Sequence, residues 1–595
     1  MMRGPLSIGG RDPSLGSLTG GLPSASLPER CFMRRPGWTS LIVLTTLFVT
    51  TGCGPNASQS SDETRAAAGS AMLDAVADYG EMGSVRFDSG CSDAAQELAV
   101  RGITLLHHMT YLDAGETFVA ATEADPNCTI GYWGQAMAII HPVWPDVPGE
   151  EGLLRGAELV RLARERTSPS GRAAAYLATV EAYFEDGLEK TELERLAAFE
   201  AAWRELAEAF PDDVEAKALY ALSHVAIASP QDKTYEHQYR ALELLDDVLE
   251  AIPDHPGGHH YVIHARDYPP LAEEALEVAR AYGRMAQNIP HALHMPTHIY
   301  TRVGLWDESI DGNAEAADAA TRQGERLGGI TTDFHHSLDY LAYSHLQRGE
   351  DGSAGDVMAR AIAADGPWVS KNPPAIAYAL SAIPARVTME RADWEAAAAL
   401  ETRQPAGFPW SDGLAPFEAI TYFAKAVGAA RSGQAEAARS AIATLREFED
   451  RVSQTASAAY WKNQIRVQRL TGEAWLAWES GDREVGLSLM REAANLEAAT
   501  DKHAVTPGEV IPAAEFLGEM LLASGNIEEA LASFRTALER SPNRLNGLAG
   551  AGRAAAEAGE SEAAAEYFRR LLELTATADG ELPQMTLARE YLASQ

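Results

Sequence analysis

The chain has 595 residues, with 85 Asp or Glu against 49 Lys or Arg, so its formal net charge is −36. Such acidity disfavours a nucleic-acid-binding or anionic-membrane-binding surface, because those surfaces depend on clustered basic side chains. An apolar fraction of 46% argues against a mostly disordered chain, and four cysteines are too few for a disulfide-dense scaffold. A chain of this length is expected to fold as several domains or as a repeat array.

Residues 1–53 are predicted to be a leader followed by an export signal. Met33 precedes two arginines and the apolar run Leu41–Val49, after which small residues lead to Cys53. A basic start, a short apolar run and small residues at the cleavage point are typical of a secretory signal, and this run is too short to span a bilayer. The sequence leaves open whether translation starts at Met1 or at Met33.

The end of this segment resembles a bacterial lipoprotein signal, with Cys53 as the lipidated residue. One departure is Thr50, which stands where such signals usually have Leu. The resemblance implies export, lipidation at Cys53 and a membrane-anchored protein on the periplasmic face or the cell surface. A secreted protein that is cleaved nearby without lipidation is the alternative. Residues 54–90 are interpreted as a tether and lead-in segment, because their first part is rich in small and polar residues.

Two cysteines remain for the mature protein, Cys91 and Cys128, since Cys31 lies in the leader and Cys53 would carry the lipid. In an oxidising compartment two such cysteines are predicted to form a disulfide, which would join the two ends of the first helical hairpin. Two free buried thiols are the alternative.

The rest of the chain is rich in Ala, Leu, Glu and Arg, and its apolar residues recur every three or four positions, which predicts helices. A period of 34 residues is clearest near the C-terminus. The first copy has Gly518, Leu521, Gly525, Ala530, Phe534 and Ala537, and the second has Gly552, Ala555, Gly559, Ala564, Phe568 and Leu571. This pattern resembles the tetratricopeptide repeat (TPR). The resemblance implies an all-α fold, a TPR-like α-solenoid of antiparallel helix pairs.

The same spacing divides the folded part of the chain into predicted segments. They are 91–141 as a first TPR-like unit, 142–221 as irregular helical hairpins, 222–362 as a His-rich TPR-like core, 363–510 as divergent helical repeats, and 511–595 as a C-terminal TPR pair with an end helix. Within the His-rich core, an insertion at 322–333 is expected to form a loop.

Histidines are concentrated in this core, since ten of the sixteen lie within residues 255–345. His260 and His264 are four residues apart on a predicted helix, so both rings leave the same face. His294 and His298 repeat this pair 34 residues later. In TPR folds the corresponding positions face the concave groove, so the four rings are expected to line it.

Neighbouring helices pack about 8–10 Å apart, so side chains of adjacent helices reach a common point. We therefore expect a site for a divalent transition metal, with the ligands His260, His264, His294, His298 and Asp339. Imidazoles alone suit Zn, Cu or Ni, and imidazoles with a carboxylate suit Fe, Mn or Zn. Supporting or alternative ligands are His259, His291, His335 and His336. Asp339 or Asp267 is expected to fix the tautomer of a ligand ring.

Three strings resemble a group of bacterial TPR-domain proteins: HHYVIHA (259–265), PHALHMPTHIYTRVGLWDESIDGN (290–313) and FHHSLDYLAYSHLQRG (334–349). The resemblance implies a helical repeat fold with a His-bearing core, and it implies no particular reaction. The positions that it carries over are His260, His264, His291, His294, His298, His335 and Asp339, with His255 and His345 at its edge.

The sequence has no Gly-rich phosphate loop and no HExxH, GxSxG or CxxC motif. Two functions remain. In the first, the groove binds a protein or peptide of the cell envelope, and the histidines make polar contacts or hold a structural metal. In the second, the same histidines hold a metal that performs hydrolysis or oxidation, so the sequence does not decide whether the protein is an enzyme. A purely structural histidine face is the alternative to any metal site.

Overall fold

The structure is a computed structural model that describes residues 79–144, 147–229, 232–369, 373–452, 456–500 and 506–595. The predicted leader, the lipidation site Cys53 and most of the tether 54–90 lie outside these ranges. Within them the secondary structure is α-helical, with two short 3-10 segments and one isolated parallel bridge between Ile330 and Trp368. The predicted all-α fold is confirmed.

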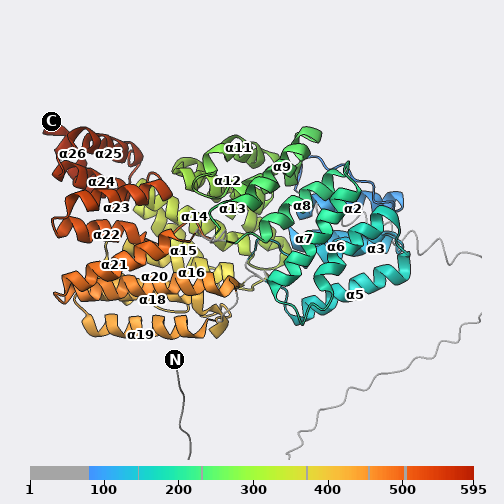
Figure 1. Cartoon of the computed structure of the whole chain (residues 1–595), viewed down its shortest axis with the longest axis horizontal. Coiled ribbons are helices and arrows are strands. Elements are labelled where there is room, and N and C mark those ends of the chain that lie inside the picture. Colours follow the sequence, from blue (N-terminus) through green and yellow to red (C-terminus); the bar gives the residue numbers. More distant parts are fainter. Residues whose placement is uncertain (1–78, 145–146, 230–231, 370–372, 453–455, 501–505) are drawn as a thin grey trace, which may run out of the picture. The chain divides into compact units, whose positions relative to one another are not determined.

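The helices follow one another along the chain, and the connections between them vary in length (Figure 1). The first group is α2 (Asp93–His107), α3 (Tyr111–Ala124), α4 (Thr129–Met137), α5 (Glu150–Thr167), α6 (Gly171–Phe184), α7 (Glu192–Ala209), α8 (Val214–Ala226) and α9 (Glu236–Ala251). The central group is α10 (Pro256–Arg266), η1 (Ala272–Ala275), α11 (Leu276–Met285), α12 (Pro290–Val303), α13 (Trp306–Leu327), α14 (Thr332–Arg348), α15 (Asp351–Ala363) and α16 (Pro373–Met389). The last group is α17 (Trp394–Ala399), η2 (Asp412–Leu414), α18 (Ala415–Arg431), α19 (Ala435–Arg451), α20 (Ala456–Glu479), α21 (Arg483–Ala498), α22 (Ala513–Ala523), α23 (Ile527–Arg540), α24 (Leu545–Glu557), α25 (Ser561–Leu574) and α26 (Pro583–Ala593).

Two kinds of packing define the repeat architecture. Consecutive helices pack against each other, as in the pairs α2/α3, α12/α13, α20/α21 and α24/α25. Alternate helices pack as well, as in α10/α12, α12/α14, α14/α16, α18/α20 and α22/α24. Stacking of hairpins through alternate helices is the contact pattern of an α-solenoid. It places α10, α12 and α14, which carry the histidines, next to one another.

Glycines at the repeat positions make room for aromatic rings. A Cβ atom on Gly518 would lie 2.7 Å from the ring of Phe534, and a Cβ atom on Gly550 would lie 2.3 Å from the same ring. In the first unit, Phe118 fills the matching space beside Gly134. Because a glycine leaves no side chain, the helices approach each other closely and the ring is fully enclosed. This packing explains the small residues of the 34-residue pattern.

The segment 322–333 differs from the predicted loop, because helix α13 continues through it to Leu327 and ends at Gly328 with a positive φ of 79°. The extension is fixed by a long-range contact. Arg326 donates to the buried carboxylate of Asp113 on α3 at 2.6 Å, and the hydroxyl of Tyr79 donates to the same carboxylate at 2.6 Å. The extended helix therefore joins the N-terminal residues to the His-rich core.

Cys91 and Cys128 form a disulfide, with their Cα atoms 5.0 Å apart. Cys91 lies just before α2, and Cys128 lies just before α4. The disulfide therefore joins the two ends of the hairpin α2/α3. In the described part of the chain, no helix combines the length and the apolar character that a membrane crossing requires.

Candidate metal centre

The histidines of the core lie on three neighbouring helices and are buried. His260 and His264 belong to α10, His291, His294 and His298 to α12, and His336 to α14. Their exposed fractions range from 0% to 9%. The sequence placed the rings in an open concave groove, and the structure corrects this prediction. Other parts of the chain cover them.

Two contacts show what covers the rings. The backbone carbonyl of His107, at the end of α2, lies 2.6 Å from Nδ1 of His260. The ring of Trp144, in the connection between α4 and α5, lies 5.2 Å from the ring of His291. The N-terminal hairpins therefore occupy the side of α10 and α12 that the sequence analysis left open for a peptide.

The expected single site is also corrected, because the structure divides the histidines into two groups. His260, His264 and His291 form the first group, and His294, His298 and His336 form the second. In each group, one ring nitrogen of every histidine lies within 4.8 Å of one from each other member. The three histidines of α12 face different neighbouring helices. The ring of His291 contacts His260 on α10. The rings of His294 and His298 lie near His336 on α14.

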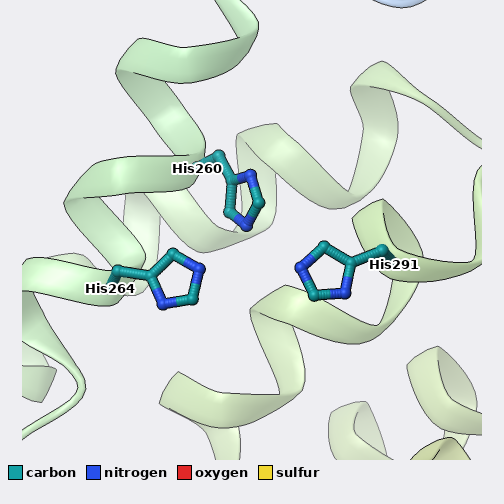
Figure 2. Close-up of side chains that lie close together, drawn as sticks. All are labelled: His260, His264 and His291. Atoms are coloured by element: carbon teal, nitrogen blue, oxygen red, sulfur yellow. The ribbon is translucent and has the colours of Figure 1, made fainter. Parts of the chain in front are cut away.

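In the first group the rings point toward one another (Figure 2). The ring of His260 lies 4.8 Å from that of His264 and 5.1 Å from that of His291, between centroids. Since a carbonyl oxygen only accepts hydrogen bonds, Nδ1 of His260 carries the proton that is donated to His107. Nε2 of His260 then carries a lone pair, and this atom is buried without a hydrogen-bond partner among the described residues.

The surroundings keep His260 uncharged. Burial, together with the neighbouring rings of His264 and His291, lowers the pKa of His260 well below its ordinary value. Nδ1 of His291 lies 3.5 Å from a carboxylate oxygen of Asp333, and Nε2 of His291 has no hydrogen-bond partner within the described ranges. A neutral imidazole with an unused lone pair is the form that binds a metal ion.

The histidines of the second group make more hydrogen bonds to surrounding side chains than those of the first group. Nδ1 of His294 lies 2.7 Å from Oδ1 of Asn313, and Nδ1 of His298 lies 2.9 Å from Oδ2 of Asp267. The guanidinium of Arg302 donates to the other carboxylate oxygen of Asp267 at 2.8 Å. Asp267 therefore orients a histidine ring, which is the role that the sequence predicted for Asp339 or Asp267.

Within this second group, the two Nε2 atoms of His294 and His298 lie only 2.9 Å apart. The ring of His336 lies 4.3 Å from that of His294, between centroids. Burial, and then the nearby rings of His336 and His298, lower the pKa of His294 well below its ordinary value. The group is therefore a second buried cluster of imidazole nitrogens.

A third cluster, which the sequence analysis missed, joins His107, Glu215 and His255. Nε2 of His107 lies 2.6 Å and Nε2 of His255 3.1 Å from the carboxylate of Glu215. The remaining nitrogens bond to Tyr261 and to the backbone N–H of Gly258. Although burial raises the pKa of Glu215, the two histidines outweigh this effect and lower it to about 2. Since every histidine nitrogen here has a partner, this cluster is a structural network, and its members lie too far apart in sequence for a local pattern to reveal them.

Four other predicted residues also lie outside the two groups. Asp339 faces Arg386 of α16 at 3.3 Å, and burial raises its pKa to about 6 despite that guanidinium. Nε2 of His335 bonds to the carbonyl oxygen of Ala361, and Nε2 of His259 bonds to that of Pro253. These contacts correct the assignment of Asp339 as a ligand, and they direct His335 and His259 away from the cluster atoms. His345 pairs with Glu350 and is likewise separate.

One segment of the chain is similar in sequence to a known repeat family. The sequence matches the family model described as tetratricopeptide repeat over residues 512–544. The chain contains a tetratricopeptide repeat. The match spans α22 and α23, where the sequence pattern was clearest, so the TPR prediction is confirmed there. No curated protein matches the chain in sequence.

Among solved structures, matches to this chain have low sequence identity and low TM-scores. The APC/C hetero-tetramer Cut9-Hcn1 has 13% identity and a TM-score of 0.34, over 90% of this chain and 84% of that chain. The human IFIT1 dimer with m7Gppp-AAAA has 12% identity and a TM-score of 0.35, over 87% and 95%. Yeast Tom70 has 12% identity and a TM-score of 0.28, over 84% and 96%.

Proposed function

We propose that this TPR-containing protein binds a divalent transition-metal ion through His260, His264 and His291. The observation that carries the proposal is the hydrogen bond of 2.6 Å from Nδ1 of His260 to the carbonyl of His107. It fixes the tautomer and leaves the buried Nε2 atom with an unused lone pair directed at two other imidazoles. Leaving such an atom buried and unpaired costs roughly 1–3 kcal/mol, and a bound metal ion removes that cost.

The donor set decides which ions fit. Three imidazole nitrogens suit Zn, Cu, Fe or Ni, whereas Mn prefers carboxylate oxygens, and Asp339 is engaged elsewhere. Zinc–nitrogen bonds are about 2.0–2.1 Å long, which places two ligand nitrogens roughly 3.3 Å apart in a tetrahedral site. The nitrogens of the group lie within 4.8 Å of one another, so the rings would move closer together when an ion binds.

The position of the site favours a scaffold role. Its ligands come from α10 and α12 of successive hairpins, and α2 orients His260, so a bound ion joins three parts of the solenoid. TPR solenoids commonly bind proteins or peptides, and we propose that role for faces of the solenoid other than the covered His-rich side. The ion then stabilises the binding surface rather than contacting the partner.

A metal-dependent hydrolase or oxidase is the second candidate. Its support is that the group supplies three ligands, because four-coordinate zinc with three protein ligands keeps a position for water or substrate. Binding of azide to the cobalt-substituted protein, followed by a change in the visible spectrum, tests for that position. An unchanged spectrum contradicts the catalytic alternative.

We also propose a location in the cell envelope, with lipid attached to Cys53. The support is the signal-like sequence before Cys53 and the disulfide between Cys91 and Cys128, since disulfides persist in oxidising compartments. Mass spectrometry of membrane fractions tests this proposal. An unmodified Cys53 within the mature chain contradicts it.

Metal analysis of residues 54–595 tests the metal site. We expect His260→Gln to lose one equivalent of bound metal relative to the unaltered chain. His259→Gln is the matched control, because His259 is adjacent on α10 and its Nε2 atom bonds to Pro253 instead. Equal metal content in the two variants, with both folded by circular dichroism, refutes the site.

A further inference from the structure

The second group of histidines brings two imidazole nitrogens close enough to share a cation. Asn313 donates from Nδ2 to the carbonyl oxygen of Ser309 at 2.7 Å, which turns its Oδ1 atom toward His294. That oxygen accepts from Nδ1 of His294 at 2.7 Å. The proton of a neutral His294 is therefore on Nδ1, and its Nε2 atom carries a lone pair.

His298 reaches the same state from the opposite side. Its Nδ1 atom lies 2.9 Å from the carboxylate of Asp267 and 3.1 Å from the hydroxyl of Tyr340. Because a carboxylate only accepts hydrogen bonds, we place the proton on Nδ1, so that Nε2 of a neutral His298 also carries a lone pair. The two Nε2 atoms lie 2.9 Å apart in a fully buried position. Two lone pairs at this distance repel each other unless a cation lies between them.

The cation is either a proton or a metal ion, and the third ring distinguishes the two. A shared proton joins only two nitrogen atoms, whereas a metal ion can be bound by three. His336, on α14, contributes a ring nitrogen within 4.8 Å of those of both His294 and His298. Three imidazoles around one point are a ligand set for a metal ion.

We propose that His294, His298 and His336 bind a second divalent transition-metal ion. This site shares no ligand with that of His260, so it stands or fails independently of the proposed function. Asp267 and Asn313 orient two of the ligands through their Nδ1 atoms, as carboxylate and amide groups do behind many metal-bound histidines. The carboxylate of Asp267 also offsets part of the ion's charge.

The two sites are neighbours on one helix. His291 of the first group and His294 of the second have ring centroids 6.4 Å apart on α12. The chain thus presents a row of six imidazoles from α10 through α12 to α14. The row takes imidazole-binding ions such as Zn²⁺ or Co²⁺ rather than ions that prefer oxygen ligands.

Metal stoichiometry tests this inference. The chain of residues 54–595 is stripped with chelator, reloaded with excess Zn²⁺, desalted and analysed by mass spectrometry for metal. We expect two equivalents in the unaltered chain, one in His336→Gln, one in His260→Gln and none in the double variant. His335→Gln is the matched control and is expected to keep two, because His335 is adjacent on α14 and bonds to Ala361.

The outcomes separate the two sites. Metal that His336→Gln retains in full, while His260→Gln loses it, overturns the second site and leaves the first. The reverse pattern supports the second site and overturns the first. If His336→Gln does not fold, a Co²⁺ titration of the unaltered chain is the test. Visible absorption that saturates at two equivalents of Co²⁺ supports both sites. Saturation at one equivalent overturns the proposal that the chain has two metal sites.

Discussion

Arg544 and Glu390 form an ion pair in which neither side chain is exposed to solvent, with a guanidinium nitrogen 2.8 Å from a carboxylate oxygen. The same guanidinium donates to Glu515 on α22 at 2.6 Å and to the hydroxyl of Tyr343 on α14 at 2.8 Å. Arg544 precedes α24, so this network links the C-terminal TPR pair to the helix that carries His336. The network lies where residues far apart in the sequence meet.

Replacing Arg544 with Met is expected to destabilise the protein by about 3–5 kcal/mol, because two buried carboxylates lose the cation with which both pair. Chemical denaturation followed by circular dichroism measures the change. Arg569→Met is the control, since Arg569 pairs with Glu566 on the surface with about half of each side chain exposed, and it is expected to change stability by less than about 1 kcal/mol. Similar values for the two variants contradict the assigned importance of burial.

Gly518→Ala is expected to destabilise the TPR unit by about 1–3 kcal/mol, because the added Cβ atom would lie 2.7 Å from the ring of Phe534. Gly355→Ala offers a comparison of the same chemical change in helix α15, where nothing lies within 4 Å of the added atom. There the change is expected to stabilise by about 0.5–1 kcal/mol, since alanine favours helix. Differential scanning calorimetry of both variants gives the sign, and a stable Gly518→Ala protein contradicts the packing account.

Removing the disulfide by the double change Cys91→Ser and Cys128→Ser is expected to cost about 2–5 kcal/mol, because the bond closes a loop of residues separated by 37 positions. Thermal unfolding with and without reductant measures the loss. Reductant is expected to lower the midpoint of the unaltered chain and to leave that of the double variant unchanged. A midpoint that does not respond in the unaltered chain refutes the prediction.

His108 is expected to make the protein sensitive to acid. Burial lowers its pKa to about 3, and its neutral form is fixed between the hydroxyl of Tyr282 and the carbonyl of Met82. The unfolded chain takes up a proton near the ordinary histidine pKa of about 6.5, whereas the folded chain does not. Stability from this group is therefore complete above about pH 6.5 and falls by about 1.4 kcal/mol per pH unit as the pH drops toward 3.

Denaturant unfolding between pH 6 and pH 4, in chelator, tests this dependence with His108→Gln. The variant loses stability at neutral pH, because glutamine does not reproduce both hydrogen bonds of the ring. The stability of the variant is expected to fall less steeply with acid than that of the unaltered chain. The two slopes should differ by about 1.4 kcal/mol per pH unit. Parallel curves for the two proteins would show that His108 titrates alike in both states.

The helical repeat was predictable because it depends on local signals. The 34-residue spacing of small and aromatic residues recurs in α22 to α25. Gly518 and Gly552 make room for the rings of Phe534 and Phe568, whereas Gly525 and Gly559 adopt a positive φ at the turns. The pairs His260/His264 and His294/His298 also follow from helical periodicity, and both pairs lie on single helix faces as expected.

The division into two groups was not predictable from periodicity. His335 and His336 are adjacent, and one residue of helical rotation decides which ring faces His294. Asp339 has the expected register, but its partner Arg386 comes from α16, and nothing near Asp339 in the sequence indicates that contact. His107 and Trp144 cover the histidines of the core. Both residues lie far from those histidines in the sequence, so the sequence pattern does not indicate these contacts.

Helix α12 carries ligands of both proposed sites, with His291 one turn before His294. An ion bound at the first site restricts the rotation of this helix about its own axis and so prearranges His294 and His298. If both proposed sites bind metal, the second ion would then lose less conformational entropy on binding, so that occupancy of the first site would strengthen the second without supplying any of its ligands. A helix of 14 residues would thus couple the occupancy of two centres without any change in fold.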